Sequence, residues 1–337
     1  MPQFTSPEYD TVDLFAGVGG LDLPAGAIGL HPVGIEKSPD ACATRRAAGL
    51  ATIHGDVRHY GPDDFPAARR LLGGPPCQTF SATGTGTGRR ELDIVLALVA
   101  MMAARRPVER ELAALADERT ALVLEPLRWV LAAADAGRPY ETVVLEQVPA
   151  VLPVWNAYAA VLRAVGYSVA AGVLKAEQYG VPQTRRRAVL IARLYGAAAL
   201  PEPTHRPYRP GVGQDGGDGR LLPWVSMRQT LNRPGPFTVV SNYGTGGDPA
   251  ARGRRTADMP AATVTGKVFR SRIVSRDGTE SRFTPSEAGL LQTFPADHPW
   301  SGRDVGQQIG NAVPPLLGEH ILAAALGTGA RHLPAAA

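Results

Sequence analysis

The stretch DTVDLFAGVGG, residues 10–20, joins a short β-branched and apolar segment directly to a glycine-rich turn. A helix-like segment follows from Leu21, with Pro24 in its first turn, where proline is tolerated. A strand, a glycine turn and a helix in this order form the first unit of a doubly wound sheet. Such a turn lets a ligand approach the backbone, although glycines also end strands for structural reasons. The stretch therefore predicts an α/β fold with a ligand site at its first turn.

Acidic residues follow the next two predicted strands. The strand at 32–35 ends at Glu36, 19 residues after Gly17, close to the spacing of about 20 at which nucleotide-binding sheets place a ribose acceptor. A third strand around Ile53 leads to Asp56, which suits an adenine amino group but also suits a helix N-cap. One glycine-rich and two acidic strand ends in succession predict an adenosyl pocket.

A cysteine follows the fourth predicted strand, 70–72, in the stretch GGPPCQTFS, residues 73–81. Two prolines stiffen the turn before Cys77, and the run of glycine and threonine at 83–88 is typical of a hinge. A Pro-Cys dipeptide is common, so these residues alone do not identify Cys77 as a nucleophile.

Charged groups mark the later strands as well. The fifth predicted strand, 140–145, is capped by Glu146, and three arginines at 185–187 lie at the entrance of an apolar strand at 188–191. More arginines and a lysine crowd a glycine-rich region at 252–276. The net charge of +4 is compatible with a nucleic-acid partner, although a solvated basic face is an equally good interpretation.

Composition limits the class of protein. The chain has 337 residues, of which 44% are hydrophobic, enough for one large α/β domain and a smaller unit. Its two cysteines, Cys42 and Cys77, offer no disulfide framework, which favours a cytoplasmic protein with reduced thiols. The first ten residues lack the pattern of a signal peptide, and no apolar run is long enough to span a bilayer.

Changes in texture predict the domain organisation. We expect a catalytic domain at 1–199, with a helical insertion at about 89–116. In the module at 200–282, proline and glycine become dense and periodicity fades. Helical pattern returns in a C-terminal segment at 283–330, and a short tail at 331–337 ends the chain.

Five motifs together resemble the DNA (cytosine-5) methyltransferase family, in the family's order and over nearly the whole chain. They are an opening motif for S-adenosyl-L-methionine (AdoMet) at 13–20, the nucleophile motif at 74–78, a Glu-Asn-Val-like motif at 146–148, a Gln-x-Arg-x-Arg motif at 183–187 and a last motif at 308–314 that folds back against the cofactor pocket. The resemblance implies the class I AdoMet-dependent methyltransferase fold, which is a doubly wound, mostly parallel sheet. It also makes 200–282 a smaller, loop-rich target recognition domain that contains β-structure.

The resemblance implies a reaction as well. Cys77 would add as a thiolate to carbon 6 of a cytosine flipped out of double-stranded DNA, which makes carbon 5 nucleophilic toward the AdoMet methyl group. Glu146 would serve ring nitrogen 3 and the amino group, Arg187 would hold oxygen 2, and Arg185 would support the site. The cofactor would be AdoMet, with no metal. The enzyme would be monomeric and cytoplasmic, and it would act in restriction–modification, with a restriction endonuclease as functional partner, or in phage or host defence.

The binding residues carry over by position. The cofactor set is Asp13, Phe15, Ala16, Gly17, Gly19, Gly20, Glu36, Lys37, Asp56, Val57, Pro76, Asn311, Ala312 and Val313. The residues expected to contact DNA are Gln78, Ser81, Arg89, Arg90, Arg252, Arg254, Arg255, Lys267, Arg270 and Arg272.

Three features depart from the family pattern. Gln147 stands where asparagine is usual. Lys37 stands where a bulkier apolar or aromatic residue often covers the adenine, which leaves Phe15 as the expected ring contact. The insertion at 89–116 precedes an Asp-x-Arg-x-x-Leu element at 117–122. For most residues of the helices in this region we expect a small lid or packing subdomain. The insertion itself is expected to form a lid or a DNA-contacting arm that uses Arg89, Arg90, Arg105 and Arg106.

Three alternatives remain open. An RNA cytosine-5 methyltransferase shares the fold, but its branch carries a Cys-Phe-Thr element for which this chain has no third cysteine. The presence of Cys77, Glu146 and Arg187 argues against a DNA-binding module without catalysis. An enzyme that modifies cytosine with an altered cofactor is compatible with the sequence, and Lys37 is a mild reason to keep it open.

Overall fold

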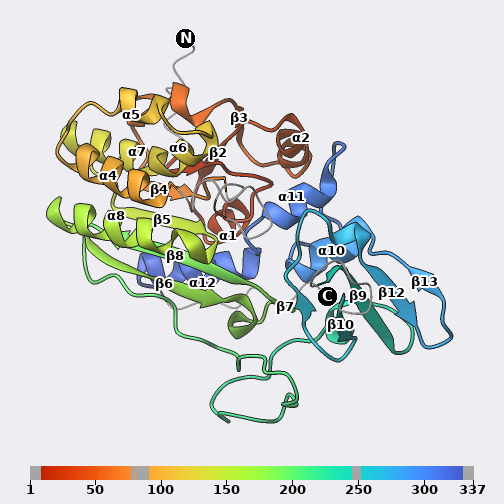
Figure 1. Ribbon diagram of the computed structural model, residues 1–337. Helices are drawn as coiled ribbons and strands as arrows, with labels where there is room; N and C mark the ends of the chain where they lie inside the picture. The colour runs from red at the N-terminus through yellow and green to blue at the C-terminus, as the bar shows by residue number, and fades with distance from the viewer. Residues whose placement is uncertain (1–8, 77–79, 81–90, 245–251, 329–337) are drawn as a thin grey trace.

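A seven-stranded sheet forms the large unit of the protein (Figure 1). The computed structural model describes residues 9–76, 80, 91–244 and 252–328. The strand order is β3-β2-β1-β4-β5-β8-β6, in which β1 to β5 are mutually parallel and β8 runs antiparallel to β5 and β6. The strands are β1 (Thr11–Leu14), β2 (Pro32–Glu36), β3 (Thr52–His54), β4 (Arg70–Gly73), β5 (Thr142–Gln147), β6 (Ser168–Lys175) and β8 (Arg186–Arg193).

This sheet confirms the predicted fold class, and two strand boundaries differ in an informative way. We expected the fifth strand to end before Glu146, but β5 continues because Glu146 and Gln147 pair with Val189 and Ala188 of β8. For the same reason β8 begins at Arg186, which pairs with β6. Pairing between strands that are distant in the sequence extends both of them beyond their apolar runs.

Helices cover both faces of the large sheet (Figure 1). One face carries α8 (Leu152–Ala164), with α4 (Leu92–Ala103) and α7 (Glu125–Asp135) packed beside it. The other face carries α12 (Pro315–Leu326), which also contacts α1 (Asp22–Ala27). Because apolar helices cover it on both sides, the sheet is buried in two hydrophobic clusters. The remaining helices of this unit are α2 (Pro39–Ala47), α5 (Glu109–Ala113) and α6 (Glu118–Ala121).

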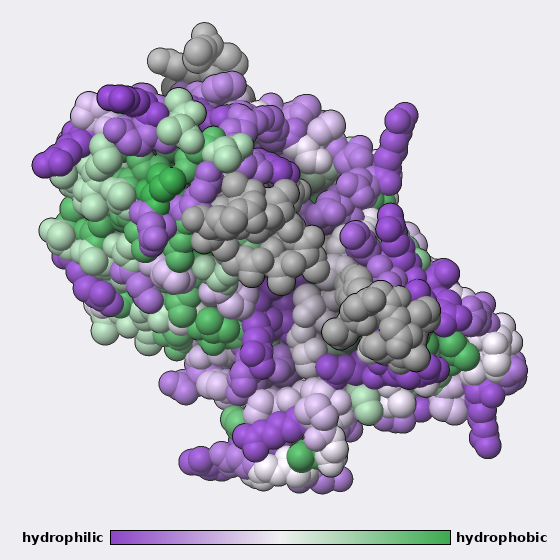
Figure 2. Space-filling view, in the orientation of Figure 1, coloured by the Kyte–Doolittle hydropathy of each residue, from purple (hydrophilic) through white to green (hydrophobic). Residues whose placement is uncertain are grey.

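The predicted insertion at 89–116 is mainly a packing layer in its described part. Val95, Leu98 and Val99 of α4 are buried in the main core. Arg105, expected to contact DNA, instead forms an ion pair with Asp135 at the end of α7, with 2.7 Å between Nε and Oδ2. The apolar face of α4 therefore packs against α8, and Arg105 is held in an ion pair within the protein. Figure 2 shows apolar side chains gathered over this helical layer.

A second, smaller unit is built on a four-stranded antiparallel sheet with the order β10-β9-β12-β13. Its own core includes Phe237, Ile273 and Phe283, together with Leu291 and Ile309 from the C-terminal segment. The strands are β9 (Phe237–Gly244), β10 (Arg252–Thr256), β12 (Arg272–Ser275) and β13 (Glu280–Ser281), and the helices are α9 (Met227–Thr230), α10 (Pro285–Leu291) and α11 (Val305–Asn311).

The two units meet at a short parallel pair, β7 (Gln183–Thr184) with β11 (Ala261–Ala262), and α11 lies between them (Figure 1). The Gln-x-Arg-x-Arg motif thus begins at the junction and continues into β8 of the large sheet. Within the described residues, the helices are too short or too polar to cross a membrane.

Candidate active site

Glu146 and Arg187 lie side by side on the neighbouring strands β5 and β8. Arg187 Nε is 2.8 Å from Glu146 Oε1, and both side chains are largely buried, with exposed fractions of 12% and 7%. The contact lacks the geometry of a hydrogen bond, so within the described chain Glu146 Oε1 is a buried oxygen that accepts none. A buried carboxyl group that keeps an unfilled acceptor position beside a guanidinium can receive a polar group from outside the protein.

The turn that leads to the predicted nucleophile is tied to the same strand. β4 ends at Gly73, and the side-chain amide of Gln147, buried at the end of β5, donates a hydrogen bond to the carbonyl oxygen of Pro75. Cys77, Gln78, Ser81, Arg89 and Arg90 lie outside the described residues. The described chain reaches Pro76, which is half-buried. The longer amide that departs from the family pattern therefore joins the acidic motif to the proline turn.

Replacing Gln147 by alanine is expected to slow methylation on the order of tenfold to a hundredfold. The change leaves the Pro75 carbonyl without its donor and loosens the turn before Cys77, and small displacements of a reacting group have effects of this size. Initial rates with tritium-labelled AdoMet test this, with melting curves as a check on folding. The asparagine variant, which keeps the amide, should retain more of the rate. An alanine variant with the wild-type rate would contradict the assignment.

Arg185 lies apart from the Glu146–Arg187 pair and is almost completely buried. It donates hydrogen bonds to the carbonyl oxygens of Val264 (3.0 Å), Gly310 (3.1 Å) and Ala312 (2.9 Å). One side chain thus holds the loop after β11 and the end of α11 together. Arg185 therefore positions the two units relative to each other through these carbonyl oxygens. This is a supporting role of the kind expected from the sequence.

The glycine turn and Glu36 form the first half of the predicted cofactor pocket. Glu36 Oε2 accepts a hydrogen bond from the Gly17 N–H (2.8 Å), and Oε1 accepts one from the Ser38 N–H (2.7 Å). A carboxylate can accept about four hydrogen bonds, so Glu36 keeps capacity for ribose hydroxyls. Gly17 has a positive φ of 54°, and a Cβ built on it would face open space, which leaves room for a ligand. Phe15, half-buried, also has a positive φ, of 59°.

A buried charged cluster lies beneath this turn. Arg45 of α2 and Asp22 of α1 are fully buried and form an ion pair of 2.7 Å between Nη1 and Oδ2. Burial raises the pKa of Asp13 well above its usual range, and the nearby Asp22 carboxylate raises it further. Asp13 Oδ1 has no hydrogen-bond partner among the described groups. The sequence analysis did not predict the Asp22–Arg45 pair. The sequence shows only a negatively charged residue in α1 and a positively charged one in α2.

Asp56, the expected adenine acceptor, is already engaged. Its carboxylate accepts hydrogen bonds from Lys37 Nζ (3.0 Å) and from Arg58 Nη2 (2.7 Å) and Nε (3.0 Å). The hydrogen bonds from Arg58 hold the pKa of Asp56 well below its usual range, so the group is a carboxylate. Asp56 also caps the short helical turn that begins at Val57, as the alternative interpretation expected.

The last motif folds against the glycine turn. A Cβ on Gly20 would lie 2.2 Å from the carbonyl oxygen of Val313, so only glycine permits this approach. Ala312 and Val313 are buried, and Asn311 is exposed and accepts a hydrogen bond from Gln307 (2.6 Å). The structure therefore brings the first and last motifs together, with Ala16 and Gly19 in the same turn.

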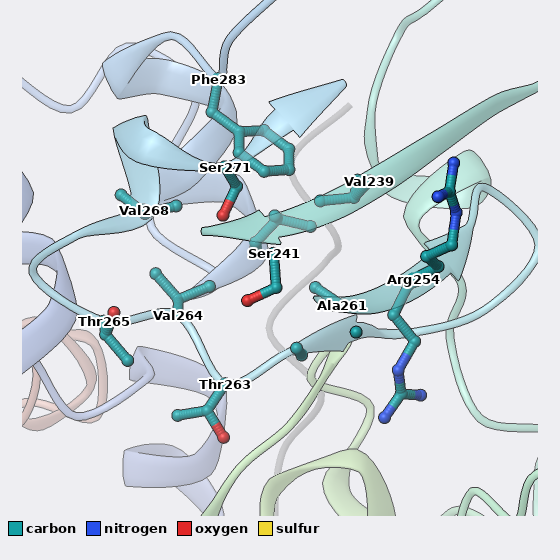
Figure 3. A pocket seen from close by; sticks show the side chains of 14 residues that line it. Val239, Ser241, Arg254, Ala261, Thr263, Val264, Thr265, Val268, Ser271 and Phe283 are labelled. Carbon is teal, nitrogen blue, oxygen red and sulfur yellow. The ribbon is translucent and has the colours of Figure 1, made fainter. Parts of the chain in front are cut away.

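The arginines of the small unit fall into two groups. Arg255 stacks over Tyr208 at 4.6 Å, and Arg272 pairs with Glu280 at 2.6 Å, so both are engaged within the protein. The side chains of the second group form no ion pair with a described carboxylate; they are Arg252, Arg254, Lys267 and Arg270. Arg254 borders a cavity of about 560 Å³, on which Ser241, Val264 and Ser271 converge (Figure 3).

The described residues fit AdoMet at the ribose end of the predicted cofactor pocket, but not fully at its adenine end. Spare acceptor capacity on Glu36 and open space at Gly17 suit a ligand with hydroxyl groups. At the other end, the carboxylate of Asp56 is filled. The described residues hold no cluster of three or more His, Cys, Asp or Glu placed to bind a metal ion.

Two kinds of comparison agree with this geometry. At 28% identity, the chain is similar to the type II methyltransferase M1.HphI of Haemophilus parahaemolyticus, over 94% of this chain and 86% of that protein. It is also similar, at 27%, to M.AplI of Arthrospira platensis, over 92% and 83%. Two solved structures share the fold: the S. pombe Dnmt2 methyltransferase (TM-score 0.59, 15% identity, 94% of this chain and 98% of that one) and the Entamoeba histolytica methyltransferase EhMeth (0.58, 12%, 95% and 98%).

A family model described as C-5 cytosine-specific DNA methylase matches residues 9–107 and 131–209. Together these ranges cover just over half of the chain, and they include both the glycine turn and the Glu146–Arg187 pair. The resemblance seen in the sequence is confirmed, and this chain belongs to the C-5 cytosine-specific DNA methylase family.

Proposed function

We propose that this cytosine-5 DNA methyltransferase acts on a flipped-out cytosine in double-stranded DNA through a covalent bond to Cys77. The observation that carries the proposal is the Glu146–Arg187 pair, which is buried and 2.8 Å apart and keeps an unfilled acceptor on Glu146. A pyrimidine ring that presents nitrogen 3, an amino group and oxygen 2 along one edge offers a partner to both side chains.

The chain's own residues would act in a fixed order. The Cys77 thiolate adds to carbon 6, and Glu146 donates a proton or a strong hydrogen bond to nitrogen 3, where electron density builds up. Arg187 holds oxygen 2 and fixes the ring plane. When bound, AdoMet supplies the electrophilic methyl group for carbon 5. Loss of the carbon 5 proton then restores the double bond to carbon 6 and expels Cys77 as a thiolate.

The described part of the pocket gives AdoMet named contacts. Glu36 would accept hydrogen bonds from the ribose, and the turn at 15–20 would lie along the ligand. The relatives named above are type II methyltransferases. We extend that description to this chain and propose a sequence-specific modification enzyme, with a restriction endonuclease as its functional counterpart. The recognition module would be 200–282, with Arg252, Arg254, Lys267 and Arg270 available to DNA.

Incubation with AdoMet and mixed-sequence DNA containing 5-fluorocytosine tests the mechanism. Fluorine at carbon 5 blocks the final elimination, so a protein–DNA adduct that survives denaturation is expected, and mass spectrometry should place it on Cys77. The Cys77→Ser variant should form none, whereas Cys42→Ser, which changes the buried second cysteine, should still form it. A parallel reaction with a tRNA transcript tests the RNA alternative. Absence of any DNA adduct would count against the proposal.

A further inference from the structure

The acidic group at the adenine end of the pocket has no acceptor position left. Asp56 Oδ1 accepts from the N–H (3.1 Å) and the Nε (3.0 Å) of Arg58. Oδ2 accepts from Arg58 Nη2 (2.7 Å) and Lys37 Nζ (3.0 Å). Since a carboxylate offers about four acceptor positions, these four donors fill it. An exocyclic amino group can reach Asp56 only by displacing one of them.

Lys37 is the donor that yields most easily. Arg58 holds Asp56 through its guanidinium and also through its backbone, and its Nη1 lies 3.4 Å from Glu118 Oε2. Lys37 makes one side-chain contact, and its side chain is 68% exposed on a flexible stem. The position follows from the sheet: Lys37 comes directly after β2, and Asp56 follows the neighbouring strand β3, where Glu36 pairs with His54.

We propose that Lys37 competes with the adenine amino group for Asp56 and so weakens the selectivity of the pocket for adenine. The inference rests on the proposed use of AdoMet and concerns only how this chain holds its adenine end. In the wild type, part of the binding free energy is used to open the Lys37–Asp56 pair. Without the ammonium group, Asp56 Oδ2 would be an open acceptor for the exocyclic amino group of adenine, whereas hypoxanthine carries an oxygen acceptor at that position.

Calorimetry on the full chain with S-adenosyl-L-homocysteine and with its hypoxanthine analogue, S-inosyl-L-homocysteine, tests this. Lys37→Met should bind the adenosyl compound about two- to fivefold more tightly than the wild type, because an exposed ion pair contributes little. Its preference for adenosyl over inosyl should rise by the same factor. Higher salt should tighten wild-type binding of the adenosyl compound by screening the pair, and should change the variant less.

Two further variants make the test specific. Lys175→Met removes a lysine from β6, at the opposite edge of the sheet from β3, and should leave both affinities unchanged. In an Asp56→Asn background, Lys37→Met should lose most of its effect, since the pair is already broken.

The possible outcomes separate the two proposals. If the wild type binds the adenosyl compound but Lys37→Met shows equal or weaker binding, or an unchanged preference, the competition is refuted and the proposed function stands. An equal effect of Lys37→Met with and without Asp56 also refutes it. If the wild type binds no adenosyl compound, both proposals fall.

Discussion

Replacing Glu146 by glutamine is expected to lower the methylation rate by about 10²- to 10⁴-fold, the usual contribution of a positioned acid. Glutamine keeps the shape of the side chain but cannot supply a proton to nitrogen 3, and it loses the charge that faces Arg187. Single-turnover rates with labelled AdoMet and mixed-sequence DNA measure the effect. Thermal melting measures separately the stability lost when the buried Arg187 guanidinium loses its counter-charge.

A matched variant separates chemistry from charge. Glu141 lies just before β5 and forms a partly exposed ion pair with Arg69. Glu141→Gln is the same chemical change and should leave the rate within about twofold, since surface pairs contribute little. A Glu146→Gln rate within tenfold of the wild type would exclude Glu146 from the acid role.

Replacing Arg45 by methionine is expected to lower the free energy of unfolding by about 3–5 kcal/mol, the usual effect of breaking a buried ion pair. Arg45 is fully buried and donates to Asp22 as well as to the carbonyl oxygen of Ala51 (3.0 Å) and the hydroxyl of Thr52 (3.1 Å). Its loss leaves the Asp22 carboxylate buried without a counter-ion, close to Asp13, whose pKa is raised by burial. Urea unfolding followed by circular dichroism measures the loss.

The double variant Asp22→Leu, Arg45→Met should recover much of this stability, because an apolar pair of similar volume leaves no buried charge. Arg105→Met provides the comparison, since it breaks a partly exposed pair with Asp135 and should lower stability by no more than about 1 kcal/mol. If the double variant is as unstable as Arg45→Met alone, the loss comes from the carbonyl partners of Arg45 and the ion pair is not its cause.

Local sequence predicted the elements that carry the chemistry. The alternation of apolar runs and glycine turns predicted β1 and its turn, because buried strands favour apolar residues and a positive φ favours glycine. Glu36 followed from its place at the end of a predicted strand and from its spacing to Gly17. The shared site of Glu146 and Arg187 came from the resemblance, since 41 residues separate them and neither has a local pattern that points to the other. The sequence indicated that α4 is an apolar helix, but only the tertiary structure decided that it packs against α8, because one apolar helix face can pack against many others.

Long-range partners were decided only in three dimensions. The amide of Gln147 meets a carbonyl 72 residues away, and the guanidinium of Arg185 meets one 125 residues away. Which distant carbonyl a buried donor finds depends on strand order and helix packing, and residue types alone do not encode it. The antiparallel pairing of β8 with β5, which extends β5 through Glu146, was likewise decided only by the tertiary structure.

The glycine turn at 16–20 and the acidic strand ends at Glu36 and Asp56 were determined by the sequence itself, because each is a local signature of a nucleotide-binding strand edge. Only the tertiary structure decided how many hydrogen-bond acceptor positions these carboxylates keep for a ligand. Glu36 keeps acceptor capacity, whereas Asp56 is filled by Lys37 and Arg58. The reason is geometric: the parallel pairing of β2 and β3 brings the residues beyond their ends together, and a carboxylate surrounded by donors is no longer free for a ligand.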